Sequence, residues 1–327
     1  MRKKLLFALI PAFILTLCVL IGAEIWLRSQ HISWDPRGAD SGPRAHTNCY
    51  RPAVTTGYEA TPNQCGRDED GYYRSWEGAE PDNAYSVLFF GDSIADQNRW
   101  IQEATRTLNK EWPSAVISRN AGTPGFDTCS ELQLFKEKAS HIEADALVLQ
   151  FCPNDIAVTA TVIPLPDGKA RVYVGWEYAE FPAWVLKSRL ATYIALRFVQ
   201  RQGGKSSVRT SSLPVRGCLE QFKEITAERN MKFQVILYPP FVDDYEDDSP
   251  LVSMREGDLS AKEAEDMSRK LLQEAGVEFF EVRSSFEKRD ASLVQNRNVP
   301  NDMWHPNSKA QDFIGEDVGK YLAEKLK

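Results

Sequence analysis

A serine, a histidine and an aspartate occur in short motifs whose residue types could build a nucleophilic catalytic site. Ser93 ends the motif Gly91-Asp92-Ser93, directly after an apolar run, and His305 follows Asp302 by three residues near the end of the chain. A serine hydroxyl is a weak nucleophile, so it needs a base to take its proton and a third group to hold that base in the right tautomer. Asp302 can reach the imidazole of His305 within one turn, which leaves the other ring nitrogen for Ser93.

Alternating segments of two kinds must position these motifs. Apolar runs of strand length occur at 86–90, 115–117, 146–151, 233–238 and 277–282, and amphipathic stretches with helical spacing separate most of them. Strands rich in Val, Ile, Leu and Phe between amphipathic helices are typical of a parallel sheet with helices on both faces. In such sheets ligands bind beyond the carboxyl ends of the strands, so residues that directly follow each run are the candidates for function.

Polar motifs follow four of these runs. Ser93 comes after the first run, Gly125 follows the second, Asn154 follows the third, and Asp302 with His305 follows the fifth. All are therefore expected on one rim of the sheet. A tetrahedral oxyanion needs several hydrogen-bond donors, which the backbone N–H of Ser93, the backbone N–H of Gly125 and the side-chain amide of Asn154 can offer.

Together these residues resemble the SGNH (GDSL-type) serine hydrolase family, whose four blocks occur here in the family's order. The resemblance covers roughly residues 85–327 and implies a flavodoxin-like, three-layer α/β/α fold with a central five-stranded parallel sheet. It also implies cleavage of carboxylic esters without a metal or other cofactor, with Ser93, His305 and Asp302 as the catalytic triad. The family often has glycine where this chain has Gln97 and Cys152, which affects the substrate more than the reaction class.

Other functions remain open for the same residues. An O-acyltransferase or a deacetylase of cell-envelope polysaccharide would use the same triad, and a tethered binding or assembly module could keep the fold without catalysis. Taken singly, Ser93 could be a helix N-cap, Gly125 a left-handed loop residue and Asn154 part of a turn. The ester substrate could be a small molecule, a lipid or an acylated glycan.

Composition limits the partners. The chain has 327 residues, of which 43% are hydrophobic and 26% are charged, as in globular proteins. Its 39 Lys and Arg residues against 46 Asp and Glu residues give a net charge of -7, so it lacks the basic field that nucleic acids attract. His31, His46 and His141 have no accompanying motif, and no Cys/His cluster indicates zinc.

The first thirty residues differ from the rest of the chain. Arg2-Lys3-Lys4 precedes the stretch 5–27, which carries no charge before Glu24 and would span roughly 30 Å as a helix. This predicts a cytoplasmic start and a single transmembrane anchor over 1–30, with the remainder on the extracytoplasmic side. A signal peptide cleaved near Gly22-Ala23 is the alternative.

Two further segments are expected outside the alternating pattern. Residues 31–84 are rich in Pro and Gly yet carry many aromatic residues, which favours an ordered extension over a flexible linker. Residues 156–216 interrupt the alternation as an insertion with a turn at 166–168, and its amphipathic stretch is expected to pack over the core through Leu190, Ile194 and Phe198. The hydrolase domain is thus expected over 85–327.

Five cysteines follow the predicted anchor, so in an oxidising compartment an odd one is left over. Cys49 and Cys65 are the expected pair, because both lie in a segment with few apolar residues to hold it. Cys152 is expected to be a free buried thiol or a partner of Cys129. The acidic run at 243–248 is expected to be a solvated loop, since its spacing lacks an EF-hand pattern.

Overall fold

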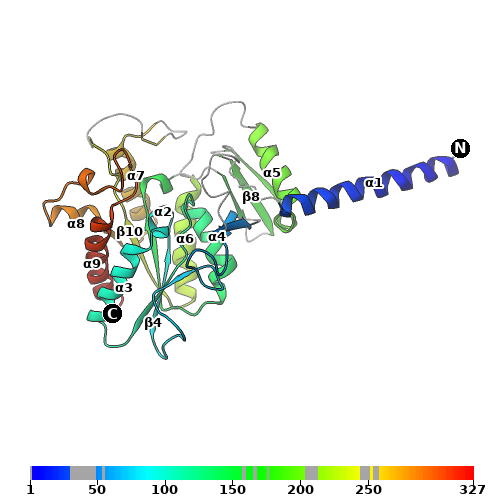
Figure 1. Cartoon of the computed structure of the whole chain (residues 1–327). Coiled ribbons are helices and arrows are strands. Elements are labelled where there is room, and N and C mark those ends of the chain that lie inside the picture. Colours follow the sequence, from blue (N-terminus) through cyan, green and yellow to red (C-terminus); the bar gives the residue numbers. More distant parts are fainter. Residues whose placement is uncertain are drawn as a thin grey trace.

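The fold is built on a six-stranded sheet (Figure 1). The computed structural model describes residues 2–29, 49–53, 56–156, 160–164, 168–174, 177–202, 213–243, 251–252 and 258–327. The strand order is β11-β10-β6-β4-β5-β3. The strands span Phe279–Glu281 (β11), Lys232–Leu237 (β10), Ala146–Phe151 (β6), Tyr85–Phe90 (β4), Val116–Asn120 (β5) and Tyr73–Arg74 (β3).

The predicted parallel sheet is confirmed, with one strand more than expected. β11, β10, β6, β4 and β5 are parallel and correspond to the five predicted strands, in the flavodoxin-like order in which the chain reverses direction beside the first strand. The prediction of five strands was wrong because β3 adds an antiparallel strand on β5, pairing Tyr73 with Asn120. β3 has two residues, too few to show the alternation that marks a strand, and it belongs to the extension 31–84.

Helices cover both faces of the sheet, which gives three layers. One face carries α4 (Thr128–Lys138), α6 (Leu213–Glu228) and α7 (Ala261–Glu274), and the other carries α3 (Arg99–Glu111), α8 (Arg283–Glu287) and α9 (Ser308–Lys325). Successive strand residues point to opposite faces, so Leu88 and Phe90 lie in the first core while Val87 and Phe89 lie in the second. Both cores exclude solvent almost completely, which explains why residues 87–90 of β4 are all apolar.

Several shorter elements lie between these helices and strands or precede them. They are the hairpin β1 (Tyr50–Ala53) and β2 (Gly57–Ala60), the one-turn helix α2 (Ser93–Asp96), and the 3-10 turns η1 (Ala139–His141), η2 (Pro153–Ile156), η3 (Ala183–Lys187) and η4 (Val294–Asn296).

The insertion 156–216 forms a small unit of its own. Its three antiparallel strands, β7 (Ala160–Pro164), β8 (Lys169–Val174) and β9 (Glu177–Pro182), are followed by α5 (Arg189–Gln202). The predicted inward face of α5 is wrong at two of its three residues, because Ile194 and Phe198 are 55% and 50% exposed, whereas Leu190 packs against the insertion's buried cluster and Val199 is fully buried. Residues 166–167 of the predicted turn and 244–248 of the acidic run lie outside the described residues.

The cysteines form two disulfides. Cys49–Cys65 is the predicted pair, and Cys129–Cys218 joins α4 to α6. The alternative pairing of Cys129 with Cys152 is therefore wrong, and Cys152 is a free buried thiol. Disulfides persist in oxidising compartments, so the two bonds indicate that the folded domain lies outside the cytoplasm.

The first helix, α1, spans Arg2–Ser29 and projects from the side of the molecule that carries α5 (Figure 1). Within the described residues, no helix has both the length and the apolar character that crossing a membrane requires. The transmembrane anchor predicted for 1–30 is therefore not supported. The carboxyl end of α1 instead packs on the insertion, where Leu27 is 4% exposed in a cluster with α5 and β8.

Glu24 fixes this end of α1 to the insertion. Its carboxylate accepts hydrogen bonds from the backbone N–H of Arg189 (3.0 Å), from the backbone N–H of Leu190 (2.8 Å) and from the Ser188 hydroxyl (2.9 Å). Although burial raises the pKa of Glu24, the bonds from Leu190, Arg189, Arg28 and Ser188 lower it to about 2. The side chain thus occupies the start of α5 as a cap supplied by a distant helix.

Glu24→Gln is expected to loosen this contact, because a neutral amide accepts weaker hydrogen bonds than a carboxylate. Hydrogen exchange at the Arg189 and Leu190 amides should accelerate roughly tenfold at neutral pH. Since the folded pKa is lowered, the stabilisation is present above the ordinary value of 4.5 and is lost as pH falls toward 2. Glu220→Gln, which removes an exposed helical ion pair with Arg216, is the control; equal exchange in both variants would contradict the role of Glu24.

Candidate active site

The site lies at the switch point of the sheet. β4 and β6 are neighbours, and the chain leaves them for helices on opposite faces, the arrangement in which α/β sheets bind ligands at the carboxyl ends of the strands. α2 begins three residues after the end of β4, and η2 begins two residues after the end of β6. Ser93 and Asn154, which the sequence singles out, therefore follow the carboxyl ends of these two neighbouring strands.

Ser93, His305 and Asp302 form a continuous hydrogen-bonded chain. The Nε2 atom of His305 lies 2.7 Å from the Ser93 hydroxyl oxygen, and its Nδ1 atom lies 3.0 and 3.1 Å from the two carboxylate oxygens of Asp302. Ser93 and His305 are 212 residues apart in sequence, so only the fold brings them together. A protonated Nδ1 facing the carboxylate leaves Nε2 as the acceptor for the serine proton.

The loop that carries Asp302 keeps its carboxylate ionised. Its Oδ1 atom accepts the backbone N–H groups of Trp304 and His305, both at 3.0 Å. Burial raises the pKa of Asp302, but these two bonds and the neighbouring His305 ring outweigh it and lower the pKa below its ordinary value. The side chains of His305 and Asp302 are 27% and 13% exposed, so the ring is accessible from the rim while its partner is shielded.

The two remaining predicted residues lie on the same rim. Asn154 is exposed, and its Nδ2 donates to Oδ2 of Asp92 at 3.1 Å, which leaves the second amide hydrogen for a ligand. Gly125 is exposed in the left-handed conformation with φ +78°. Its loop is joined to the serine motif by a 2.9 Å bond from Thr123 N to Gly91 O. Within the described residues, no hydrogen bond joins Asn154 or Gly125 directly to Ser93.

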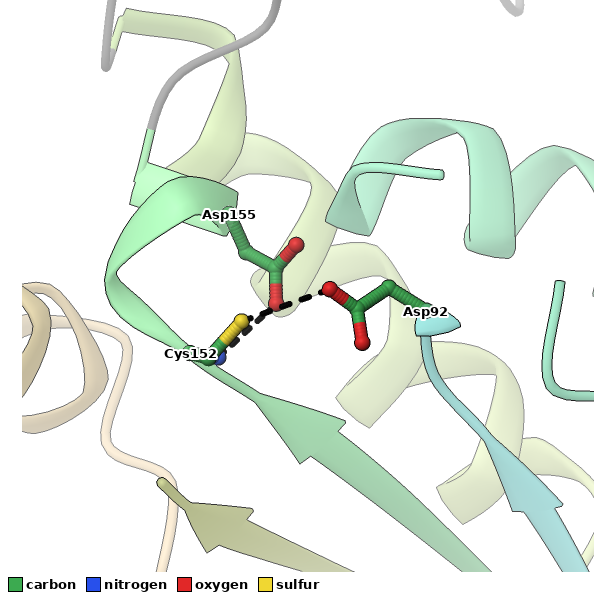
Figure 2. A group of neighbouring side chains, drawn as sticks. All are labelled: Asp92, Cys152 and Asp155. Carbon is green, nitrogen blue, oxygen red and sulfur yellow. Dashed lines mark hydrogen bonds between the residues drawn. The ribbon is translucent and has the colours of Figure 1, made fainter. Parts of the chain in front are cut away.

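Asp92 belongs to a buried group that the sequence did not reveal. Figure 2 shows the side chains of Asp92, Cys152 and Asp155 pointing toward one another. The Cys152 thiol lies 3.4 Å from Oδ2 of Asp92 and also contacts Oδ1 of Asn154, and Asp155 accepts the Cys152 backbone N–H at 2.8 Å. Asp92 thus orients the side chain of Asn154 by accepting a hydrogen bond from its amide. The sequence held one signal of this group, which was a cysteine at position 152 where glycine was expected. Only the fold shows which residues Cys152 contacts.

These three residues are also the described ones whose ligand atoms are close enough for a metal ion, all within 4.8 Å of one another. Metal binding needs a thiolate. Burial and the nearby Asp155 and Asp92 carboxylates raise the pKa of Cys152, so the thiol stays protonated at neutral pH. Its proton can be donated to Asp92, and the group therefore fits a hydrogen-bonded cluster better than a cation site.

Glu131 of α4 adds a further buried carboxyl group. It is 1% exposed, and neither of its carboxylate oxygens has a hydrogen-bond partner in the described structure. Burial raises the pKa of Glu131, and so do the nearby Asp155 and Asp92 carboxylates. Burial and Asp92 likewise raise the pKa of Asp155. The cluster therefore retains protons that isolated carboxylates would lose.

A polar pocket of about 570 Å³ lies at the end of α2, and its lining does not include the triad residues. It is lined by the end of α2, the start of α3, the start of α9 and part of the extension, with Tyr73, Arg74, Gln97, Arg99, Gln102 and Gln311 among its residues. Gln97 contacts Gln311 across it, and Gln97 N donates to Ser93 O at 3.3 Å. Gln97 thus lines this pocket.

Comparisons with known proteins gave matches among solved structures alone. No protein-family model matches the chain, and no curated protein matches it. A GDSL-like lipase from Parabacteroides merdae is 17% identical, over 77% of this chain and 100% of that one, with a TM-score of 0.41. A catalytic mutant of an acetylxylan esterase from Geobacillus stearothermophilus is 12% identical, over 76% and 96% respectively, with a TM-score of 0.45. At these values no inference about fold or activity rests on the similarity.

Proposed function

We propose that the protein is an extracytoplasmic serine esterase that cleaves carboxylic esters through an acyl-enzyme intermediate. The observation that carries the proposal is the hydrogen-bonded chain from the Ser93 hydroxyl through His305 to the Asp302 carboxylate. A nucleophile, a base and an orienting group in contact, at the switch point of a doubly wound sheet, are the parts that acyl transfer requires. The two disulfides support the location.

In the proposed reaction, the Ser93 oxygen attacks the ester carbonyl while His305 Nε2 takes its proton. The backbone N–H groups of Ser93 and Gly125 and the amide of Asn154 stabilise the negative charge on the carbonyl oxygen. The tetrahedral intermediate collapses, the alcohol leaves with the proton from His305, and the acyl group stays on Ser93. Water then attacks the acyl-enzyme with His305 as base, and the acid and the free serine result. Asp302 holds the ring and stabilises its charged form throughout.

A fluorophosphonate probe and a short-chain aryl ester test this proposal. The probe is expected to label wild-type protein at Ser93, as mass spectrometry of peptides will show, because only an activated serine reacts. Ser93→Ala and His305→Ala should lower ester turnover by about 10³-fold or more. Ser284→Ala, whose hydroxyl bonds to the backbone of Glu281, is the matched control and should behave as wild type. Unchanged turnover in the Ser93 and His305 variants would refute the proposal.

The polar pocket favours a second candidate, in which the ester's alcohol part is a polyhydroxylated molecule such as a glycan. Amide and guanidinium side chains that line the pocket can bond hydroxyl groups, whereas a lipid chain would lose its apolar contacts there. Deacetylation and acyl transfer to a sugar would both use this pocket. Incubation with an acyl donor and an oligosaccharide separates them, since transfer yields an acylated sugar and hydrolysis yields free acid.

A further inference from the structure

The nucleophile's helix is held from outside at both of its ends. α2 has four residues, too few to keep its direction by its own hydrogen bonds. At its start, Asp92 accepts the N–H of Ile94 at 2.9 Å and donates its own N–H to Gln150 at 3.0 Å. At its end stands Asp96, three residues after Ser93. The direction in which Ser93 presents its hydroxyl therefore depends on what holds Asp96.

Three donors bond the same carboxylate oxygen of Asp96, and all three come from the extension. The Arg67 Nη2 lies 2.5 Å from Oδ1, the Tyr50 hydroxyl 3.0 Å and the Tyr73 hydroxyl 3.3 Å. The Cys49–Cys65 disulfide closes this segment next to Tyr50 and Arg67. A part of the chain that precedes the hydrolase motifs thus contacts the helix of the nucleophile.

Arg67 joins its own segment of the extension to α2 and to the loop that begins at Gly122. Its guanidinium donates to the carbonyl of Gly122 at 2.8 Å and to the carbonyl of Gly71 at 2.9 Å, in addition to Asp96. Its side chain is 0% exposed and lies over the Tyr73 ring at 4.3 Å. A buried guanidinium with several fixed acceptors is held in one geometry, because any movement would leave a buried charge without partners.

The bridged segments touch backbone to backbone. A Cβ atom at Gly122 would lie 2.5 Å from the nitrogen of Asp96 and 2.6 Å from the carbonyl carbon of Ala95, so only glycine fits there. Gly122 opens the loop that carries Gly125, the predicted oxyanion donor. Arg67 bonds both sides of this contact and so fixes the distance between the loop and α2.

We infer that Arg67 is a positioning residue, which sets the orientation of Ser93 toward His305 and toward the loop of Gly125. Arg67 does not touch the reacting atoms and acts through Asp96 and Gly122. The inference rests on the proposed serine esterase function. It adds that the extension helps to position Ser93 in the site. The extension's disulfide then serves catalysis as well as stability.

The test compares Arg67→Met and Arg67→Lys with Arg51→Met, all in the full chain. Arg67→Met should lower kcat on a small aryl acetate about 10- to 100-fold, because small displacements of a nucleophile have effects of that size. KM should change less than about twofold, since a positioning residue acts after binding. Arg67→Lys should fall between, because an ammonium keeps the charge but cannot reach all three acceptors. Arg51, which pairs with Glu59 in the same extension, should be neutral.

Active-site titration with the fluorophosphonate probe separates positioning from folding. A positioning role predicts complete labelling of the variant at a reduced rate. A merely structural role predicts a smaller labelled fraction that reacts at the wild-type rate, and that result would overturn the inference. If Arg67→Met does not fold, the Tyr50→Phe and Tyr73→Phe double variant removes two donors to Asp96 and should show the same slow, complete labelling. Failure of wild type to be labelled would instead refute the proposed function.

Discussion

Asp302→Asn is expected to lower kcat on a short-chain ester by about 10³- to 10⁴-fold, with little change in KM. The carboxylate lies 3.0 Å from Nδ1 of His305 and fixes the tautomer in which Nε2 can accept the Ser93 proton. An asparagine can present its amide nitrogen to Nδ1 instead, which favours the opposite tautomer and leaves Nε2 protonated. The fold should survive, because Asn is nearly isosteric and can still accept the N–H groups of Trp304 and His305.

Steady-state kinetics from pH 5 to 9 checks this expectation. Because the pKa of Asp302 is lowered, the wild-type carboxylate stays ionised across this range, and the rate difference should persist at its acidic end. Asp290→Asn, an acidic residue outside the site, is the control. Turnover by Asp302→Asn within tenfold of wild type would mean that another group orients His305.

Glu131→Gln is expected to make the protein more stable at pH 8. The substitution replaces a buried ionisable carboxyl group with a neutral amide. Burial and the neighbouring carboxylates raise the folded pKa of Glu131 above its ordinary value of 4.5. Between these two pKa values the folded state holds a proton that the unfolded state has lost, so the free energy of unfolding falls as pH rises. For one proton the slope reaches about 1.4 kcal/mol per pH unit. Glutamine cannot ionise, so the free energy of unfolding of the variant lacks this fall with rising pH.

Urea unfolding of both proteins from pH 5 to 9 gives the two slopes. Wild type should lose stability with rising pH more steeply than Glu131→Gln, and the difference should grow toward alkaline pH. Glu137→Gln, in the same helix but bonded by Gln133 at 3.1 Å, should keep the wild-type slope. A Glu131→Gln slope equal to that of wild type would show that Glu131 is ionised in the folded state.

The sequence predicts the sheet well because burial on both faces makes the central strands β4, β6 and β10 mostly apolar. It also predicts Ser93, Asn154 and the Asp302–His305 pair as candidates at one rim, because ligands of such sheets bind beyond the strand ends. The carboxyl ends of parallel strands share one edge of the sheet. The common rim can therefore be predicted without knowledge of side-chain contacts.

The interactions that hold the site in place could not be predicted in the same way. Arg67, Asp96 and Glu131 look like ordinary charged residues, and only the fold shows that Arg67 and Glu131 are buried and that Asp96 accepts donors from the distant extension. The inward face of α5 was misjudged for a related reason, since the helix turns Ala195, Leu196 and Val199 toward its small cluster on the insertion and leaves Phe198 half exposed. Likewise, apolar content alone predicts nothing of the contact between Glu24 and the start of α5.

The two outermost strands of the sheet are its shortest. β3 has two residues and β11 has three, and each carries a charged residue, Arg74 and Glu281, at its end. An exposed edge offers unpaired N–H and C=O groups to any other chain, and long edges invite fibre-like pairing. Here an incoming strand would find too few groups to form a ladder. The extension that contributes β3 therefore also protects the protein from self-association through its sheet.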